Sequence, residues 1–229
     1  MNPILDNILW HTLSGPHARF SVGTDSVRRY APGFSPIIGF ADVLKPDLAA
    51  LKPLCNADEH FYCAGWTGVV PAGWRLEAEA SMFRMVWAAE TPADGALGDA
   101  GVVRLTAEHA EAALALATLT NPGPFGLRTL ELGDYVGSFE NGQLVAMAGE
   151  RMQADVFHEI SGVCTHPDFQ ARGLAKRLML ALIRRQLLRG ETPFLHVMRD
   201  NVTAHGLYQR MGFEDYCEVP VRVISRLGS

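Results

Sequence analysis

A strand-like segment, a polar turn and the start of a long helix follow one another between residues 159 and 190. The strand is rich in small and β-branched residues, and the helix begins within residues 170–175, which read QARGLA. The first N–H groups of a helix have no internal partner, and the helix dipole adds about half a positive charge there, so a phosphate can accept several hydrogen bonds at once. This order of elements predicts an α/β fold with an anion site at the start of the helix.

The residues of the turn suit a phosphate in size and charge. Gly173 and Ala175 carry no bulk, so a phosphate could approach the backbone to a hydrogen-bonding distance of ~3 Å. Arg172 and Lys176 would add positive charge within the first turn. The alternative is an ordinary helix start whose small residues serve packing, and the hexapeptide alone leaves both interpretations open.

The periodicity of the chain predicts alternating elements on both sides of a proline- and glycine-rich segment at residues 91–101. In the second half, Thr106 is the expected N-cap of a helix, and Asn141-Gly142 is a strong hairpin turn signal. The expected strands there are 135–140, 143–151, 159–165, 194–199 and 217–224, and the later helices are 172–189 and 202–211. In the first half, the residue pattern predicts helices at 4–13 and 46–55 and strands at 18–22, 36–40, 61–64 and 82–88.

Three blocks in order resemble the GNAT superfamily of acetyl-CoA-dependent N-acetyltransferases. Residues 170–175 match its pyrophosphate signature Q/R-x-x-G-x-G/A, and the upstream block ISGVCTHP is similar to its fourth strand. Downstream, residues 201–213 match N-x-x-A-x-x-L-Y-x-x-x-G-F. The resemblance covers about residues 103–226. Within the superfamily, the sequences of these blocks are most similar to the FR47-like branch, which includes glycine N-acyltransferase-like proteins.

The resemblance implies a GNAT fold, with a mixed central sheet and helices on both faces. Residues 101–229 would form the catalytic, acyl-CoA-binding domain. Residues 1–95 would form a smaller α/β half with a substrate-binding or structural role. Because a degenerate GNAT-like half can precede the catalytic one in this branch, that arrangement would suit the first half.

The family's cofactor contacts can be carried over position by position. The resemblance implies a splayed, bulged fourth strand whose backbone pairs with the pantetheine arm of acetyl-CoA or another acyl-CoA, with Ser161-Gly162 as the expected bulge. Asn201 would be both the N-cap of its helix and a ligand of pantetheine or the leaving group. The implied cofactor-binding residues are Val163, Cys164, Thr165, Gln170, Ala171, Arg172, Gly173, Leu174, Ala175, Lys176 and Asn201.

The same resemblance implies two catalytic residues. Glu159 lies eleven residues before Gln170, the offset of the general-base glutamate in the histone-acetyltransferase branch. Tyr208 matches the tyrosine that protonates the leaving thiolate. A solvent-exposed Glu159 and a Tyr208 used only for packing are the structural alternatives, and Glu150, His158 or water could be the base instead.

Composition excludes several other functions. The formal net charge of −5 gives no basis for a nucleic-acid or anionic-membrane partner. An acid-free run of 18 residues holds six of the 20 basic residues, of which Arg184, Arg185 and Arg189 lie too far from the turn for the same pyrophosphate. We expect these three to pair with the helix C-terminus and to keep one helix face solvated.

We expect a cytoplasmic protein without a metal site, because the four cysteines form no C-x-x-C and no membrane span or signal peptide is evident. His11, His17 and His60 match no zinc spacing with Cys55 or Cys63.

The function predicted from these observations is transfer of an acyl group to a primary amine, a small amine or amino acid before a protein, by direct attack in a ternary complex. The acceptor would meet the loop at residues 121–133 and the segment at 60–62. The protein would be a monomer or a homodimer. The alternative is a protein that binds acyl-CoA without turnover.

Overall fold

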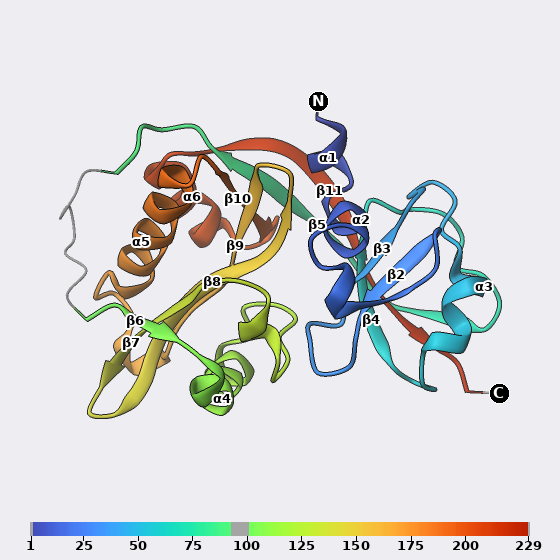
Figure 1. Cartoon of the computed structure of the whole chain (residues 1–229), viewed down its shortest axis with the longest axis horizontal. Coiled ribbons are helices and arrows are strands. Elements are labelled where there is room, and N and C mark those ends of the chain that lie inside the picture. The colour runs from blue at the N-terminus through green and yellow to red at the C-terminus, as the bar shows by residue number, and fades with distance from the viewer. Residues whose placement is uncertain (1, 93–100, 229) are drawn as a thin grey trace.

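The computed structural model describes residues 2–92 and 101–228, and a single sheet runs through both halves of the chain (Figure 1). Its strands are β4 (His60–Ala64), β5 (Trp74–Trp87), β6 (Val103–Leu105), β7 (Tyr135–Glu140), β8 (Gln143–Ala154), β9 (Phe157–Thr165), β10 (Thr192–Met198) and β11 (Phe213–Arg226). The spatial order is β4-β11-β5-β10-β9-β8-β7-β6. Strands β9 and β10 are parallel and the other neighbours are antiparallel, which confirms the predicted mixed sheet.

Helices cover both faces of this sheet, as predicted. Three of them pack on it in its second half: α4 (Ala110–Thr120), α5 (Leu174–Leu188) and α6 (Val202–Met211). Helices α5 and α6 share a core cluster with Val136 of β7, whereas α4 shares one with the neighbouring Tyr135. Since successive strand residues point to opposite faces, α4 and α5 lie on opposite sides of the sheet.

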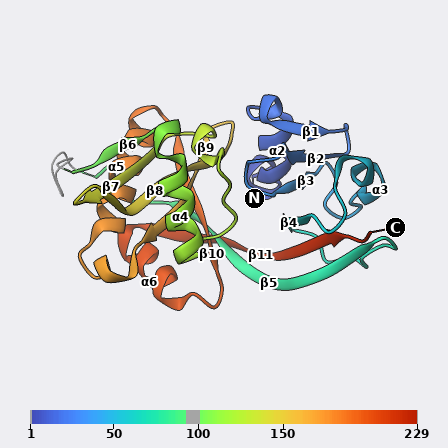
Figure 2. The same ribbon diagram turned by 90° about the horizontal axis from the view of Figure 1, so that it is seen from below.

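The N-terminal part adds a small sheet beside the main one (Figure 2). It contains α1 (Pro3–Asp6), α2 (Ile8–Ser14), α3 (Leu48–Leu51), β1 (Ser21–Gly23), β2 (Val27–Tyr30) and β3 (Ile38–Phe40). Strands β1, β2 and β3 form an antiparallel sheet. Val27, Phe40 and Leu51 pack against Phe61 of β4 and Ile224 of β11, so one core joins this part to the end of the main sheet.

Strands β5 and β11 connect the two parts. They pair from Phe213 and Trp87 at one end to Arg226 and Trp74 at the other, and Figure 2 shows the two ribbons running side by side from one part to the other. The other edge of β5 pairs with β10. The division into residues 1–95 and 101–229 stays a prediction, and most of the predicted linker, residues 93–100, lies outside the described residues.

The structure differs from the predicted elements mainly where charged residues enter strands. Strand β2 was not predicted because its sequence is VRRY, yet Arg29 is buried there and its guanidinium binds Glu59. Strand β5 begins at Trp74 instead of residue 82, because its first half, RLEAEA, is exposed and lacks a buried alternation. The strand predicted at 18–22 opens with a 3-10 turn at Ala18–Phe20.

Candidate active site

Strands β9 and β10 separate halfway along their length. They pair at three positions that end at Phe194 and Glu159, although β9 continues to Thr165 and β10 to Met198. On the other edge of β9, Ser161 and Cys164 pair with Gly149 and Met147 of β8, so β9 has one extra residue between them. The strands splay as the resemblance implies, and the bulge lies at Gly162 and Val163, one residue later than the expected Ser161-Gly162. Among the described residues, the β10-facing edge of residues 163–165 has no strand partner.

The turn after β9 contains two residues with positive φ directly before α5. Ala171 and Gly173 both lie in the left-handed region, with φ of 61° and 73°, and Gly173 is the N-cap of α5. The first helical bond joins the Arg177 N–H to the Gly173 carbonyl, so the N–H groups of residues 174–176 have no helical acceptor. A Cβ on Gly173 would meet nothing within 4 Å, which leaves room for a ligand.

The basic residues of α5 were expected to form two groups, one near the phosphate turn and one at the solvated end of the helix, and the structure agrees with this only in part. Arg172 and Lys176 are exposed, and the Arg172 guanidinium lies 4.9 Å from the Phe169 ring centroid and 3.7 Å from Glu140. At the other end of α5, Arg189 does more than pair with the helix end. Its Nη2 lies 2.7 Å from carboxylate oxygens of both Glu150 and Glu191, so the two acids share one guanidinium.

Helix α6 brings Asn201 and Tyr208 to one cavity. Asn201 caps the helix, and its Oδ1 accepts a hydrogen bond of 3.1 Å from the Ala204 N–H. Tyr208 packs on Phe213, and burial raises the pKa of its phenol to about 12. Within residues 2–92 and 101–228 the Tyr208 hydroxyl has no hydrogen-bond partner, so it can donate to a ligand.

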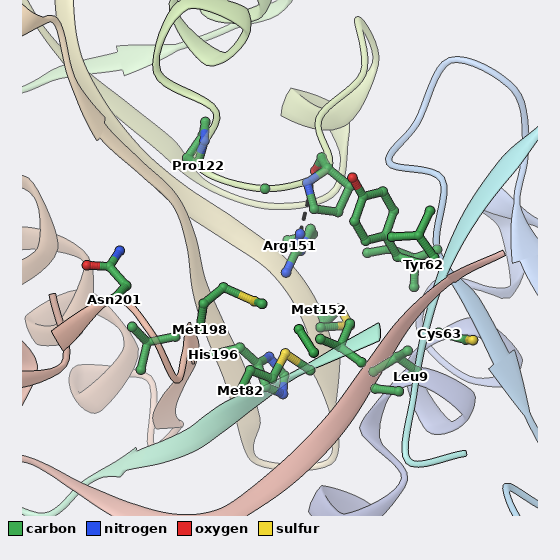
Figure 3. Close-up of a pocket in the computed structure, with 18 of the residues that line it drawn as sticks. Leu9, Tyr62, Cys63, Met82, Pro122, Arg151, Met152, His196, Met198 and Asn201 are labelled. Atoms are coloured by element: carbon green, nitrogen blue, oxygen red, sulfur yellow. Dashed lines mark hydrogen bonds between the residues drawn. The ribbon is translucent and has the colours of Figure 1, made fainter. Parts of the chain in front are cut away.

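The cavity between the two parts has a volume of about 410 Å³ (Figure 3). Asn201 lies at one end and Leu9, Tyr62 and Cys63 at the other, with Arg151, Met152 and His196 between them. The loop that was expected to meet the acceptor contributes its first four residues, 121–124. Walls thus come from strands of both parts, and the sheet's splayed region opens into the cavity through Val163, Val197 and Met198.

Glu159 is fully buried behind Arg151 and His196 and does not itself line this cavity. Its carboxylate accepts hydrogen bonds from Arg151 Nε and Nη2, at 3.0 and 2.9 Å, and from His196 Nδ1 at 2.8 Å. Burial alone would raise the pKa of Glu159, but Arg151 and the hydrogen bond from His196 hold it at about 2. A carboxylate with these partners is a weak base and has no open path to a substrate, so its predicted role as a direct base is unsupported by this geometry.

The tautomer of His196 follows from its two partners. The Arg84 Nε–H can only donate, and it points at His196 Nε2 over 3.0 Å. The Glu159 carboxylate can only accept, so the proton of the neutral imidazole resides on Nδ1. Burial lowers the pKa of His196 and keeps it neutral. Both ring nitrogens are therefore occupied.

The alternative bases, Glu150 and His158, do not line the cavity. They neighbour Arg151 and Glu159 in sequence and so point to the other face of the sheet, where Glu150 binds Gln186 and Arg189. Glu150, His158 and Glu191 place potential ligand atoms within 4.8 Å of one another. The Arg189 guanidinium already lies between the two carboxylates, so a cation is in place there without a metal.

Sequence reasoning missed Arg151, His196 and Arg84. The available signal was a charged or polar residue inside an otherwise apolar strand, where burial demands a partner. Two of these positions, Arg151 and His196, line the cavity. No helix in the described part of the chain is long and apolar enough to cross a membrane.

The comparisons with known proteins agree with this geometry. A family profile described as FR47-like protein matches residues 135–223. The N-alpha-acetyltransferase RimI of Mycobacterium tuberculosis is 35% identical over 83 residues, which are 35% of this chain and 51% of that protein. The match thus spans about half the length of this curated relative.

Solved structures extend the likeness over the whole chain. A crystal structure described as a putative acetyltransferase from the GNAT family of Novosphingobium aromaticivorans has a TM-score of 0.87 and 30% identity, covering 99% of this chain and 100% of that one. A GCN5-related N-acetyltransferase from Kribbella flavida, at 17% identity, has a TM-score of 0.64 over 99% of this chain and 96% of its own, and it shows the fold alone.

Proposed function

This chain belongs to the GNAT family of acetyltransferases, in its FR47-like branch, and we propose that it transfers an acyl group from acetyl-CoA or another acyl-CoA to a primary amine in a ternary complex. The observation that carries the proposal is the splay of β9 from β10, followed directly by the left-handed turn that opens α5. Together they offer an unpaired strand edge and free helix N–H groups to a single extended, phosphorylated ligand.

Three parts of coenzyme A would each meet a different surface of the chain. The N–H groups of residues 174–176, with Arg172 and Lys176 beside them, would bind the pyrophosphate. The open edge of residues 163–165 would pair with the amides of the pantetheine arm. Asn201 and Tyr208 would then meet the sulfur at the mouth of the cavity, and Gln170 and Ala171 would shape the turn.

The reaction would proceed by direct attack. The neutral amine forms a C–N bond to the thioester carbonyl, the C–S bond breaks, and the amine loses a proton while the thiolate gains one. The Val163 N–H would stabilise the oxyanion, since it lies in the bulge and Val163 lines the cavity. With its pKa raised to about 12, the Tyr208 phenol stays protonated and can donate to the leaving thiolate.

Glu159 would act by positioning and not by direct proton abstraction. It holds the Arg151 side chain and the His196 ring that line the cavity. The proton of the amine would then leave through water, one of the routes that the sequence left open. The first half of the chain, residues 1–95, would supply part of the acceptor wall through Leu9 and Tyr62. The four free cysteines favour a reducing, cytoplasmic setting.

A coupled assay of free thiol over a panel of primary amines tests the proposal. Amine-dependent thiol release that falls in Tyr208→Phe supports an acyltransferase. The alternative is a protein that binds acyl-CoA without turnover. Tight acetyl-CoA binding by calorimetry, with no amine-dependent thiol release across the panel, would establish that alternative.

A further inference from the structure

The middle of the cavity combines one cation with apolar walls. Arg151 and His196 lie between the Asn201 end and the Tyr62 end in Figure 3. Around them the surface is built largely from thioether and aliphatic groups, among them Met82, Met152, Met198, Leu9, Ile37 and Val223. Methionine side chains adapt to the shape of an apolar ligand. The cavity is therefore suited to an apolar body with one anionic group.

Arg151 retains hydrogen-bond donors that the protein does not use. Of its five N–H groups, one on Nε and one on Nη2 bind Glu159, and a third, on Nη1, reaches the Pro124 carbonyl at 3.5 Å. The described residues supply no partner for the other two. The side chain is 11% exposed and that surface faces the cavity, so a ligand can reach these donors.

The buried charges around the cavity do not cancel. Arg84 is 2% exposed, and its guanidinium donates to His196 and to the backbone carbonyls of Leu5 and Asp6. No carboxylate among the described residues lies within ion-pair distance of it. The Asp6 carboxylate, which attracts Arg84 from further away, is exposed and accepts a hydrogen bond from Tyr216. Glu159 neutralises one of the two arginines, and His196 is uncharged. One positive charge is left, and a buried charge is costly without a counter-charge.

We propose that Arg151 binds a carboxylate carried by the acceptor, so that the acceptor is an amine with a carboxylate and an apolar body, such as a hydrophobic amino acid. This inference rests on the proposed acyl transfer. The spare Arg151 donors offer the planar recognition that carboxylates prefer. The ligand's carboxylate would supply the missing negative charge next to the hydrogen-bonded series Arg84, His196, Glu159 and Arg151. The ligand's apolar side chain would lie among Met82, Met152 and Met198.

Matched acceptors test the carboxylate without altering the protein. L-Phenylalanine, L-phenylalaninamide and phenethylamine would be compared with acetyl-CoA in the thiol assay, with rates expressed per neutral amine because their amine pKa values differ. We expect kcat/KM for phenylalanine to exceed that for either uncharged analogue at least tenfold. Glycine, which lacks the apolar body, should fall below phenylalanine.

A binding measurement and two variants separate this inference from the proposed function. Calorimetry with coenzyme A present would compare N-acetyl-L-phenylalanine with its amide, and no turnover is needed. Arg151→Lys keeps a cation beside Glu159 but removes the spare planar donors, so it should abolish the preference for the acid. Arg189→Lys is the matched control, because it changes an arginine bound to Glu150 outside the cavity, and the preference should remain.

Three results would overturn the inference. Amine-dependent turnover with equal rates and affinities for acids and amides would refute it while the proposed function stands. A preference for succinyl-CoA over acetyl-CoA that Arg151→Lys removes would place the carboxylate on the acyl donor. If no amine is acetylated, the proposed function fails, and equal binding of N-acetyl acid and amide would then refute the carboxylate site as well.

Discussion

Gly173 offers a sharp test of the phosphate site, because α5 has a matched glycine at its other end. Gly173 has φ of 73° and Gly190 has φ of 77°, and a Cβ at either position would meet nothing within 4 Å. Replacing either glycine therefore costs about the same backbone strain, roughly 1–2 kcal/mol. Only Gly173 lies where the pyrophosphate is expected.

The expected magnitude follows from the charges. In Gly173→Glu a carboxylate would lie several ångströms from a phosphate, where two like charges repel by about 1–4 kcal/mol at an effective dielectric between water and a protein surface. That range corresponds to roughly 5- to 1,000-fold weaker binding. Gly173→Ala carries the strain without the charge, so it should lose stability but keep most of its affinity for acetyl-CoA.

Calorimetry with acetyl-CoA and thermal unfolding would be measured for Gly173→Glu, Gly173→Ala and Gly190→Glu. A glutamate is favourable at a helix N-terminus and unfavourable at the C-terminus, so Gly190→Glu should be no more stable than Gly173→Glu. Loss of affinity in Gly173→Glu alone then cannot come from unfolding. Equal affinities of the two glutamate variants, within about twofold, would refute the phosphate site.

Three further outcomes follow from the site. Tyr208→Phe should lower kcat with little change in KM for acetyl-CoA, and a kcat equal to wild type in steady-state assays would remove the phenol from the mechanism. The pKa of Glu159 is about 2 in the folded chain against about 4.5 unfolded, so it contributes about 3 kcal/mol of stability above pH 4.5 that is lost as the pH falls toward 2. Urea unfolding should show this loss in wild type, and an equally steep loss in Glu159→Gln would assign it to other groups. Arg151→Leu alone should lower the free energy of unfolding by about 3–5 kcal/mol, because it leaves the buried Glu159 carboxylate without its cation. The double variant Arg151→Leu with Glu159→Leu should lose less, and additive losses would contradict the coupling of the two residues.

The parts of the fold that sequence could predict are those set by local signals. Asn141-Gly142 forms the expected hairpin turn, with φ of 50° and 81°, and Thr106 caps its helix with a reciprocal bond to His109. The bulge near Gly162 and the left-handed Gly173 also follow from the need for a residue without a Cβ. In each case the sequence itself carries the conformational requirement.

The inner part of the site depends on contacts between distant segments. Arg84 meets His196 across 112 positions of the chain, and Arg151 meets Glu159 across a bulged hairpin. A motif places Glu159 at the right offset, but it does not reveal that two other strands deliver hydrogen-bond donors, Arg151 and His196, to its carboxylate. That is why the base predicted from spacing is a buried counter-ion in the structure.

The long strands β5 and β11 also affect the order in which the protein can assemble. Strand β5 lies between β10 and β11, and β11 is the last of the eight strands to be synthesised. Until β11 arrives, β4 has no partner within the main sheet and β5 exposes one edge to other chains. The cavity wall formed by Val221 and Val223 is missing for the same period. Completion of the sheet and of the cavity in which we propose that the acceptor binds therefore wait for the same late strand.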